Sequence, residues 1–391
     1  MRTRKLYDND GYTRVFSARV LSCSPADGRF DVVLDQTAFF PEEGGQCCDK
    51  GYLHGIPVLD VQERDGVIHH ILDCPLDQGA LVEGEIDWPF RFRNMQTHTG
   101  EHILSALILR EYRMHNKGFH LGATATVVDY DGVLERPELD RLEDEINRII
   151  YENHPVRCWY PATEELKNLS YRCKTELADP IRIVQIGENG SVDSCACCAP
   201  HVRLTGEIGM LKILDYEHYK QGTRLFLVCG TDALLDYRAR YMQDLRLSAQ
   251  YSVKQNDLSL AFSRLEKKIE QLQKTVRTLR ENELGRVLQT VSKTDGNICL
   301  FFDGATAGDL RVAMNHSLPL CGGICIVLTK KDPDSTSESY DFMMASSSKD
   351  LTPLISRLRA ELGAKCGGNP KMAQGFIPVS REAIENWVDS I

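Results

Sequence analysis

The 391-residue sequence lacks the long apolar runs of a membrane protein. No stretch approaches the ~18 uninterrupted apolar residues that a membrane span needs. The basic residues of the N-terminal segment MRTRKLYDNDGY are not followed by an apolar run, so we expect no secretory signal. We therefore expect a soluble, cytoplasmic protein with no membrane partner.

An excess of basic residues is also missing. The chain has 46 Lys and Arg against 56 Asp and Glu, which gives a net charge of −10. This balance argues against nonspecific nucleic-acid binding by the whole surface. It leaves RNA open as a partner, because a local basic stripe is enough to follow phosphates.

The sequence contains no internal repeat and no low-complexity segment, and its 42% hydrophobic and 26% charged residues are typical of globular proteins. The predicted elements indicate a multidomain α+β protein. Short apolar runs broken by the turns ADG, EEGG and RDG predict a small β-barrel over residues 1–90. Mixed helix and strand patterns predict an α+β domain over 91–230, a helical arm over 231–292 and a small α/β domain over 293–391.

The predicted helical arm has no proline between Asp232 and Leu288. Its apolar residues follow a heptad pattern, formed by Leu258, Leu265, Leu272 and Leu279 with Phe262, Ile269 and Val276 between them. This spacing is typical of a coiled coil. It fits either an antiparallel hairpin within one chain or a seam between two chains, because heptads alone do not fix the number of helices.

Most of the fourteen cysteines are scattered singly, but the segment SCACCAPH holds three of them beside His201. In a reducing compartment such a cluster favours metal binding or catalysis over disulfides. The distant segment HTGEH places His98 and His102 four residues apart, which is one face of a helix. Together with Cys197 and His201 they form an N₃S ligand set that suits zinc. Cys198 remains an alternative thiolate, because it also lies close to His201.

Several segments resemble one protein family. RFRNMQTHTGEHILSALI is similar to the HxxxH helix of the alanyl-tRNA synthetase editing domain, and CCAPHV occupies the place of that family's Cys-Gly-Gly-Thr-His-Val loop. QTAFFPEEGGQCCDKGYL resembles its glycine-rich strand and turn, and GEIGMLKIL with QGTRLFLVCG resembles the strands after the metal loop. GAKCGGNPKMAQG resembles the signature of the C-terminal domain shared by DHH phosphoesterases and alanyl-tRNA synthetase. These matching segments follow the order of the family and cover nearly the whole chain. The chain is therefore similar to the long-form, free-standing alanyl-tRNA editing proteins of the AlaX type.

The resemblance implies a translation-protein-like barrel, a zinc-containing editing domain, the arm and a DHH-associated C-terminal domain. It also implies an aminoacyl-tRNA deacylase, independent of ATP, that hydrolyses mischarged tRNA(Ala) in trans, chiefly Ser-tRNA(Ala) and also Gly-tRNA(Ala). The ester is already activated, so a zinc ion would need only to lower the pKa of a water molecule or to polarise the ester carbonyl. Two alternatives remain: a noncatalytic tRNA-binding protein with a structural zinc, and a zinc hydrolase of another ester.

The same resemblance points to residues outside the metal set. Thr37 is the candidate contact for the seryl hydroxyl, and Gln46 is a second substrate-pocket residue. A hydrogen bond to that hydroxyl discriminates serine from alanine, because alanine leaves a buried polar group unpaired.

In the C-terminal domain the resemblance favours contact with tRNA or with a second copy of the chain. Lys365 and Lys371 would meet phosphates, and Gly367 and Gly368 would allow close approach to RNA. A homodimer through the helical arm or this domain is one assembly that the sequence allows, and the sequence leaves the oligomeric state open.

The metal loop departs from the family pattern. Cys198 replaces the first glycine, and Ala199 and Pro200 replace the Gly-Thr that precedes the histidine. Losing glycines could change the loop backbone and the fit of the substrate more than metal binding.

Overall fold

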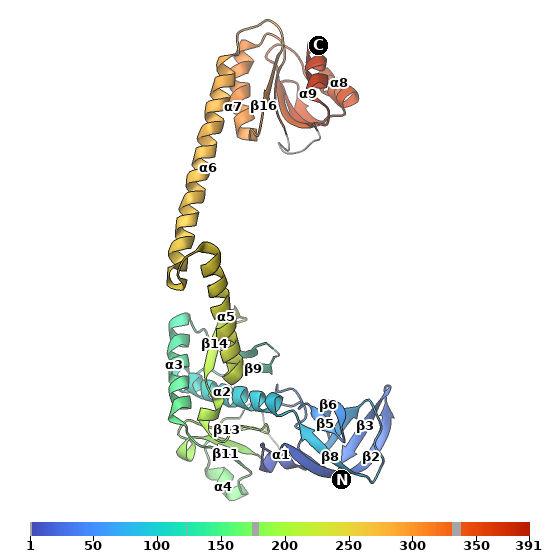
Figure 1. Cartoon of the computed structure of the whole chain (residues 1–391), viewed down its shortest axis with the longest axis vertical. Coiled ribbons are helices and arrows are strands. Elements are labelled where there is room, and N and C mark those ends of the chain that lie inside the picture. Colours follow the sequence, from blue (N-terminus) through green and yellow to red (C-terminus); the bar gives the residue numbers. More distant parts are fainter. Residues whose placement is uncertain (1, 123, 174–179, 331–337) are drawn as a thin grey trace. The chain divides into compact units, whose positions relative to one another are not determined.

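The computed structural model describes residues 2–122, 124–173, 180–330 and 338–391 (Figure 1). The chain forms two compact units, Met1–Arg246 and Leu247–Ile391. Among the described residues, no helix combines the length and the apolar character needed to cross a membrane. The four-part division expected from the sequence stays a prediction.

The first unit begins with a closed barrel whose strands follow the order β2-β3-β7-β6-β5-β8. These strands are β2 (Val15–Ala26), β3 (Arg29–Leu34), β5 (Gly51–Leu53), β6 (Ile56–Arg64), β7 (Val67–Leu72) and β8 (Leu81–Ile86). Alternate side chains point inward, and the turn between β2 and β3 is an Asp27-Gly28 pair with positive φ at both residues. The closed sheet agrees with the small barrel expected in this region. The short elements β1 (Arg4–Lys5), α1 (Leu6–Asn9) and β4 (Gln36–Thr37) complete this part, and β1 pairs with β4.

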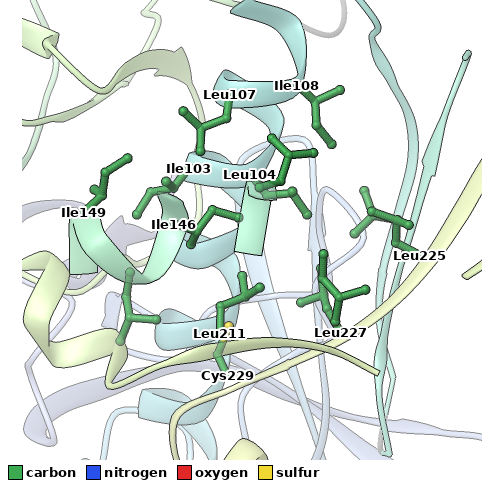
Figure 2. Close-up of a cluster of buried hydrophobic side chains, with 14 of the residues drawn as sticks. Ile103, Leu104, Leu107, Ile108, Ile146, Ile149, Leu211, Leu225, Leu227 and Cys229 are labelled. Atoms are coloured by element: carbon green, nitrogen blue, oxygen red, sulfur yellow. The ribbon is translucent and has the colours of Figure 1, made fainter. Parts of the chain in front are cut away.

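The rest of the first unit is built around α2 (Trp88–Tyr112). Asp87 caps its start by accepting a hydrogen bond from the amide of Phe90, and Arg113 ends it in the left-handed conformation. Ile103, Leu104, Leu107 and Ile108 of α2 pack against α3 (Arg136–Glu152) and a four-stranded sheet (Figure 2). The sheet has the order β14 (Leu211–Tyr219), β15 (Gly222–Cys229), β10 (Thr126–Tyr130) and β9 (Asn116–Leu121). The helical spacing of the four apolar residues is thus the reason that α2 is buried here.

A second, three-stranded sheet carries the metal loop. It consists of β11 (Val156–Trp159), β12 (Ile183–Ile186) and β13 (Asp193–Ala196), with the short helix α4 (Thr163–Asn168) before β12 in the chain. The loop begins where β13 ends at Ala196.

An ion pair between fully buried side chains joins the barrel part to α2. Arg91 Nε lies 2.8 Å from Asp49 Oδ1, and the Arg91 guanidinium also donates to the carbonyl of Gly11. Asp49 in turn accepts a hydrogen bond of 2.6 Å from the amide of Phe40. Removing one partner would leave an uncompensated buried charge, at a cost of about 3–5 kcal/mol. This pair therefore fixes the loop after Thr37 against the start of the helix that carries the two histidines.

Two helices occupy the region in which the helical arm is expected. These are α5 (Gly230–Tyr251) and α6 (Leu258–Gln289). Between them, Ser252 has a positive φ of 53° and residues Gln255–Asp257 form a 3₁₀ turn. Neither proline nor glycine marks this break in the sequence.

The second unit contains a five-stranded sheet of order β16 (Ile298–Phe302), β17 (Cys325–Lys330), β18 (Tyr340–Ala345), β20 (Met372–Ile377) and β19 (Lys365–Asn369). Only β16 and β17 pair in parallel among these strands. One hydrophobic cluster of the sheet includes residues of α8 (Thr352–Leu362) and α9 (Arg381–Asp389), and another includes α7 (Ala307–Ser317) with the end of α6. This arrangement fits the small α/β domain expected at the C-terminus.

Candidate metal centre

Four side chains that are far apart in the sequence meet in the first unit. His98 and His102 come from consecutive turns of α2, and Cys197 and His201 come from the loop after β13. One ligand atom from each of them lies within 4.8 Å of the others. The three imidazoles are at most 5% exposed. This cluster can hold a metal ion, and it contains the four residues expected from the sequence.

The loop is held by backbone contacts with Arg182. The amide of Cys197 donates to the carbonyl of Arg182, and the Arg182 guanidinium donates to the carbonyls of Cys197 and Ala199. Cys198, Ala199 and Pro200 all have negative φ angles. The loop backbone therefore needs no glycine at these positions, so their replacement in this chain introduces no strain.

Hydrogen bonds fix which nitrogen of His201 faces the cluster. Thr99 donates its hydroxyl proton to the carbonyl of Met95 at 2.7 Å, so its oxygen can only accept from His201 Nδ1, which lies 3.0 Å away. The proton of His201 is thus on Nδ1, and the lone pair is on Nε2. His201 Nε2 lies 3.4 Å from Cys197 Sγ.

The same arrangement recurs at His98, whereas His102 has a longer contact at Nδ1. Gln46 Oε1 lies 2.8 Å from His98 Nδ1, and His98 Nε2 lies 3.7 Å from Cys197 Sγ. At His102, Nδ1 lies 3.4 Å from Asp193 Oδ2. His98 and His201 thus have a hydrogen-bond partner at Nδ1, which leaves Nε2 as the atom available to a metal. His102 Nδ1 has a carboxylate nearby but no hydrogen bond among the described residues.

The electrostatics distinguish the neighbouring cysteines. Burial opposes ionisation of Cys197, but the surrounding histidines hold the pKa of its thiol well below the usual value. Burial and the nearby Glu43 carboxylate instead raise the pKa of Cys198 to about 12. Cys197 is the sulfur that lies in the cluster, and these pKa shifts favour it over Cys198 as the thiolate.

The donor set fits zinc. Three imidazole nitrogens and one thiolate are the ligand types that this ion accepts in tetrahedral sites. Hydrogen bonds orient His98 and His201, and burial lowers the pKa of His201 to about 3, so its ring stays neutral as a ligand must.

The two predicted substrate residues have different surroundings. Gln46 contacts His98 directly. Thr37 is fully buried, and its hydroxyl contacts His70 Nε2 at 2.9 Å and accepts from the amide of Phe39. Phe40, three residues later, packs in a small cluster with Cys197 and Ala199.

The four predicted RNA-binding residues lie on the β19–β20 hairpin of the second unit. Lys365 and Lys371 are exposed. A side chain at Gly368 would meet the carbonyl of Met372 at 2.3 Å, so this glycine is required by the hairpin itself. At Gly367 the space is open.

Three residues of the site were missed from the sequence: Thr99, Asp193 and Arg172. Thr99 directly follows a predicted ligand, which is a weak signal. Asp193 and Arg172 reach the site only because β13 and the preceding segment are brought together by the fold. No local pattern identifies them.

The sequence was compared with protein families and with known proteins. Residues 181–225 match the family described as threonyl and alanyl tRNA synthetase second additional domain, and residues 19–90 match tRNA synthetases class II (A). Alanyl-tRNA editing protein AlaX-L of Pyrococcus horikoshii is 28% identical over 401 aligned positions, which cover 97% of this chain and 96% of that protein. The chain is similar to alanyl-tRNA editing proteins over nearly its whole length.

Two further relatives extend this similarity. Alanyl-tRNA editing protein Aarsd1 of Mus musculus is 29% identical over 353 positions, which cover 84% of this chain and 78% of that protein. An alanine–tRNA ligase of Pyrobaculum neutrophilum is 30% identical over 96% of this chain, but the match covers 42% of the ligase. The chain thus spans less than half of that ligase. The resemblance to alanyl-tRNA editing proteins that the sequence motifs predicted is confirmed by these relatives.

Proposed function

We propose that this chain is a trans-editing deacylase that hydrolyses mischarged tRNA(Ala), with Ser-tRNA(Ala) as the main substrate and Gly-tRNA(Ala) as a second one. The observation that carries the proposal is the convergence of three imidazoles and one cysteine sulfur in a chain similar to proteins named for alanyl-tRNA editing. His98, His102, Cys197 and His201 would hold a zinc ion. When bound, the ion would supply Lewis-acid activation of the ester or of its attacking water.

The chain's own residues position the reacting groups. Gln46 uses Oε1 to orient His98, while its Nε2 is buried and has no hydrogen-bond partner among the described residues. A buried donor without a partner is costly, so a substrate acceptor at Nε2 would be favoured. This supports the role of Gln46 as a substrate-pocket residue, with the ester oxygens or the 3′-terminal ribose as its partner.

Thr37 supports a preference for serine. His70 Nδ1 lies 3.1 Å from the carbonyl of Val32, which can only accept, so His70 Nε2 accepts the proton of the Thr37 hydroxyl. Burial lowers the pKa of His70 to about 4, so the ring stays neutral. The Thr37 oxygen already accepts from the amide of Phe39, which leaves one lone pair as an acceptor. A seryl hydroxyl can donate to it, whereas alanine cannot.

A polar groove beside the cluster offers a surface for the nucleotides that carry the ester. Arg110, Arg113 and Lys117 line it, together with the aromatic rings of Phe119 and Tyr171. Phe119 lines the groove, and its ring centroid lies 4.9 Å from that of His98, so the groove borders the cluster. Basic groups with interspersed aromatic rings are typical of surfaces that bind single-stranded nucleic acid. We infer that the acceptor end of the tRNA lies here.

The second unit supports a further contact and an assembly. Lys365 and Lys371 offer exposed positive charges for tRNA phosphates. On α6 the apolar residues Ile269, Leu272 and Val276 are exposed along a groove that also includes Val312 of α7. We infer that this apolar surface pairs with a second copy of the chain.

One comparison separates the proposed function from its rivals. Ser-tRNA(Ala), a simple seryl ester and uncharged tRNA(Ala) are each mixed with the zinc-loaded protein. A trans-editing enzyme releases serine from the tRNA and leaves the simple ester almost intact. A binding protein retains tRNA without release, and a hydrolase of other esters cleaves the simple ester equally well.

A further inference from the structure

Asp193 is a buried acid beside Nδ1 of His102, a buried nitrogen that has no hydrogen bond among the described residues. It lies on β13 with a side chain that is 2% exposed, and its Oδ2 is 3.4 Å from Nδ1 of His102. Among the three histidines, His102 alone has a carboxylate at this position, because His98 faces an amide and His201 faces a hydroxyl.

Arg172 holds this carboxylate in place from the other side. Its Nε lies 2.8 Å from Asp193 Oδ1, and its Nη2 lies 2.6 Å from Asp193 Oδ2. The same Nη2 donates to the backbone carbonyl of His102 at 3.2 Å. Arg172 therefore bridges the backbone of His102 and the acid that contacts the ring of His102. A planar two-point contact of this kind fixes orientation as well as charge.

A buried ion pair is a poor way to gain stability, since desolvation offsets much of its attraction. Orientation of a ligand is a better explanation of this one. A histidine that binds a metal through Nε2 is held in the correct tautomer when its Nδ1 proton has an acceptor. With Arg172 fixing both oxygens, Asp193 cannot turn away from His102.

We propose that Asp193, clamped by Arg172, is a positioning residue that sets the tautomer and ring orientation of His102 for metal binding. The inference rests on the zinc site proposed above. A competing explanation is a second ion held by His102, Asp193 and Cys195, whose ligand atoms also lie within 4.8 Å of one another. The two explanations differ in the role of Cys195, which positioning does not require.

The test is a double-mutant cycle on zinc affinity, measured by competition with a chromophoric chelator on the full chain. Asp193→Ala should lower zinc affinity by about 10–100-fold, the usual cost of losing an outer partner of a ligating histidine. In a His102→Ala background the same change should alter affinity by less than about twofold, because the residue it positions is gone. Cobalt-substituted Asp193→Ala should show altered visible absorption bands, which loss of packing alone would not produce.

A matched control is available in the same unit. Asp129 forms a similar two-point pair with Arg224, at 2.7 and 2.9 Å, and neither residue belongs to the metal cluster. Asp129→Ala should leave zinc affinity unchanged. Asp193→Asn, which keeps the shape of the side chain, serves in the cycle if Asp193→Ala does not fold.

Three results would overturn the inference. These are an equal loss of affinity in both backgrounds, an unchanged affinity in Asp193→Ala, and a Cys195→Ser variant that loses as much affinity as Asp193→Ala. Absence of zinc binding in the unmodified protein would overturn the proposed zinc site as well. Zinc binding without coupling would overturn this inference alone.

Discussion

Gln46 Oε1 lies 2.8 Å from Nδ1 of His98, and this contact joins the glycine-rich loop before β5 to helix α2. The amide oxygen accepts the Nδ1 proton, so the His98 lone pair is directed toward the cluster. The amide nitrogen of Gln46 remains unpaired and buried among the described residues. One side chain thus orients a histidine of the cluster and keeps a buried, unpaired donor, which is what the proposed substrate role of Gln46 requires.

The assignment of the thiolate leads to a first prediction. Cys197→Ala should lower zinc affinity by more than about 100-fold, since loss of an outer partner alone costs about 10–100-fold. Cys198→Ala should change it little, because burial keeps the Cys198 thiol protonated, with a pKa of about 12. Metal content after dialysis against a weak chelator measures both. Loss of zinc from Cys198→Ala alone would contradict the assignment.

Selectivity for serine should depend on the hydroxyl of Thr37. Thr37→Val keeps the shape of the side chain and removes the acceptor, so kcat/KM for Ser-tRNA(Ala) should fall by about 10–100-fold, equivalent to about 1–3 kcal/mol. Zinc content should not change. Thr223→Val is the matched control, since Thr223 is also a fully buried, hydrogen-bonded threonine. An equal loss in both variants would mean that Thr37 acts through stability.

His70 predicts a pH dependence of stability in the barrel region. Its pKa falls from an ordinary value of 6.5 to about 4 on burial. Between these values the unfolded chain binds a proton that the folded chain does not. Each unit by which the pH is lowered in this range therefore reduces the free energy of unfolding by up to about 1.4 kcal/mol. Above pH 6.5 this loss is absent.

Urea denaturation of the His70→Gln variant from pH 7 to pH 4 measures this effect. The stability advantage of the unmodified protein over the variant should shrink as the pH falls. The exposed His120, changed to Gln, gives the baseline for losing a histidine from the surface. An advantage that stays constant or grows on acidification would be inconsistent with a neutral, buried His70.

The groove beside the cluster should contribute to tRNA affinity. Changing both Arg113 and Lys117 to glutamate should weaken tRNA(Ala) binding at least about tenfold and flatten its dependence on salt, because fewer counterions are released. A double variant with Arg29→Glu and Arg64→Glu, two exposed residues of the barrel, makes the same change in net charge and is the control. Filter binding between 50 and 200 mM salt, a range over which phosphate contacts weaken strongly, measures both quantities. Equal effects at the two surfaces would place the acceptor end elsewhere.

Sequence patterns predicted the four cluster residues because their signals are local. Two histidines one helical turn apart and a CxxxH loop are recognisable without knowing how the elements pack. The residues that orient the histidines are different, since Asp193 and Arg172 meet His102 only after β13 and α2 have come together. Long-range contacts of this kind leave no local pattern.

The interrupted arm shows a second limit. The heptads from Leu258 onward predicted helix correctly, and apolar spacing continues on both sides of residues 252–257. The break depends on the backbone of Ser252, which adopts a conformation that serine rarely needs. Only a glycine or proline at this place would have predicted it.

The most direct test of the proposed function is serine release from Ser-tRNA(Ala) in a single turnover, with Ala-tRNA(Ala) as the competing substrate. We expect the zinc-loaded protein to release serine at least about 100-fold faster than alanine, since a site that pairs a substrate hydroxyl strongly rejects the analogue without it. We also expect the His98→Ala variant to lose the activity and the Cys198→Ala variant to keep it at the level of the unmodified protein. Serine release no faster than spontaneous hydrolysis, or release that survives the loss of both His98 and His102, would contradict the proposed function.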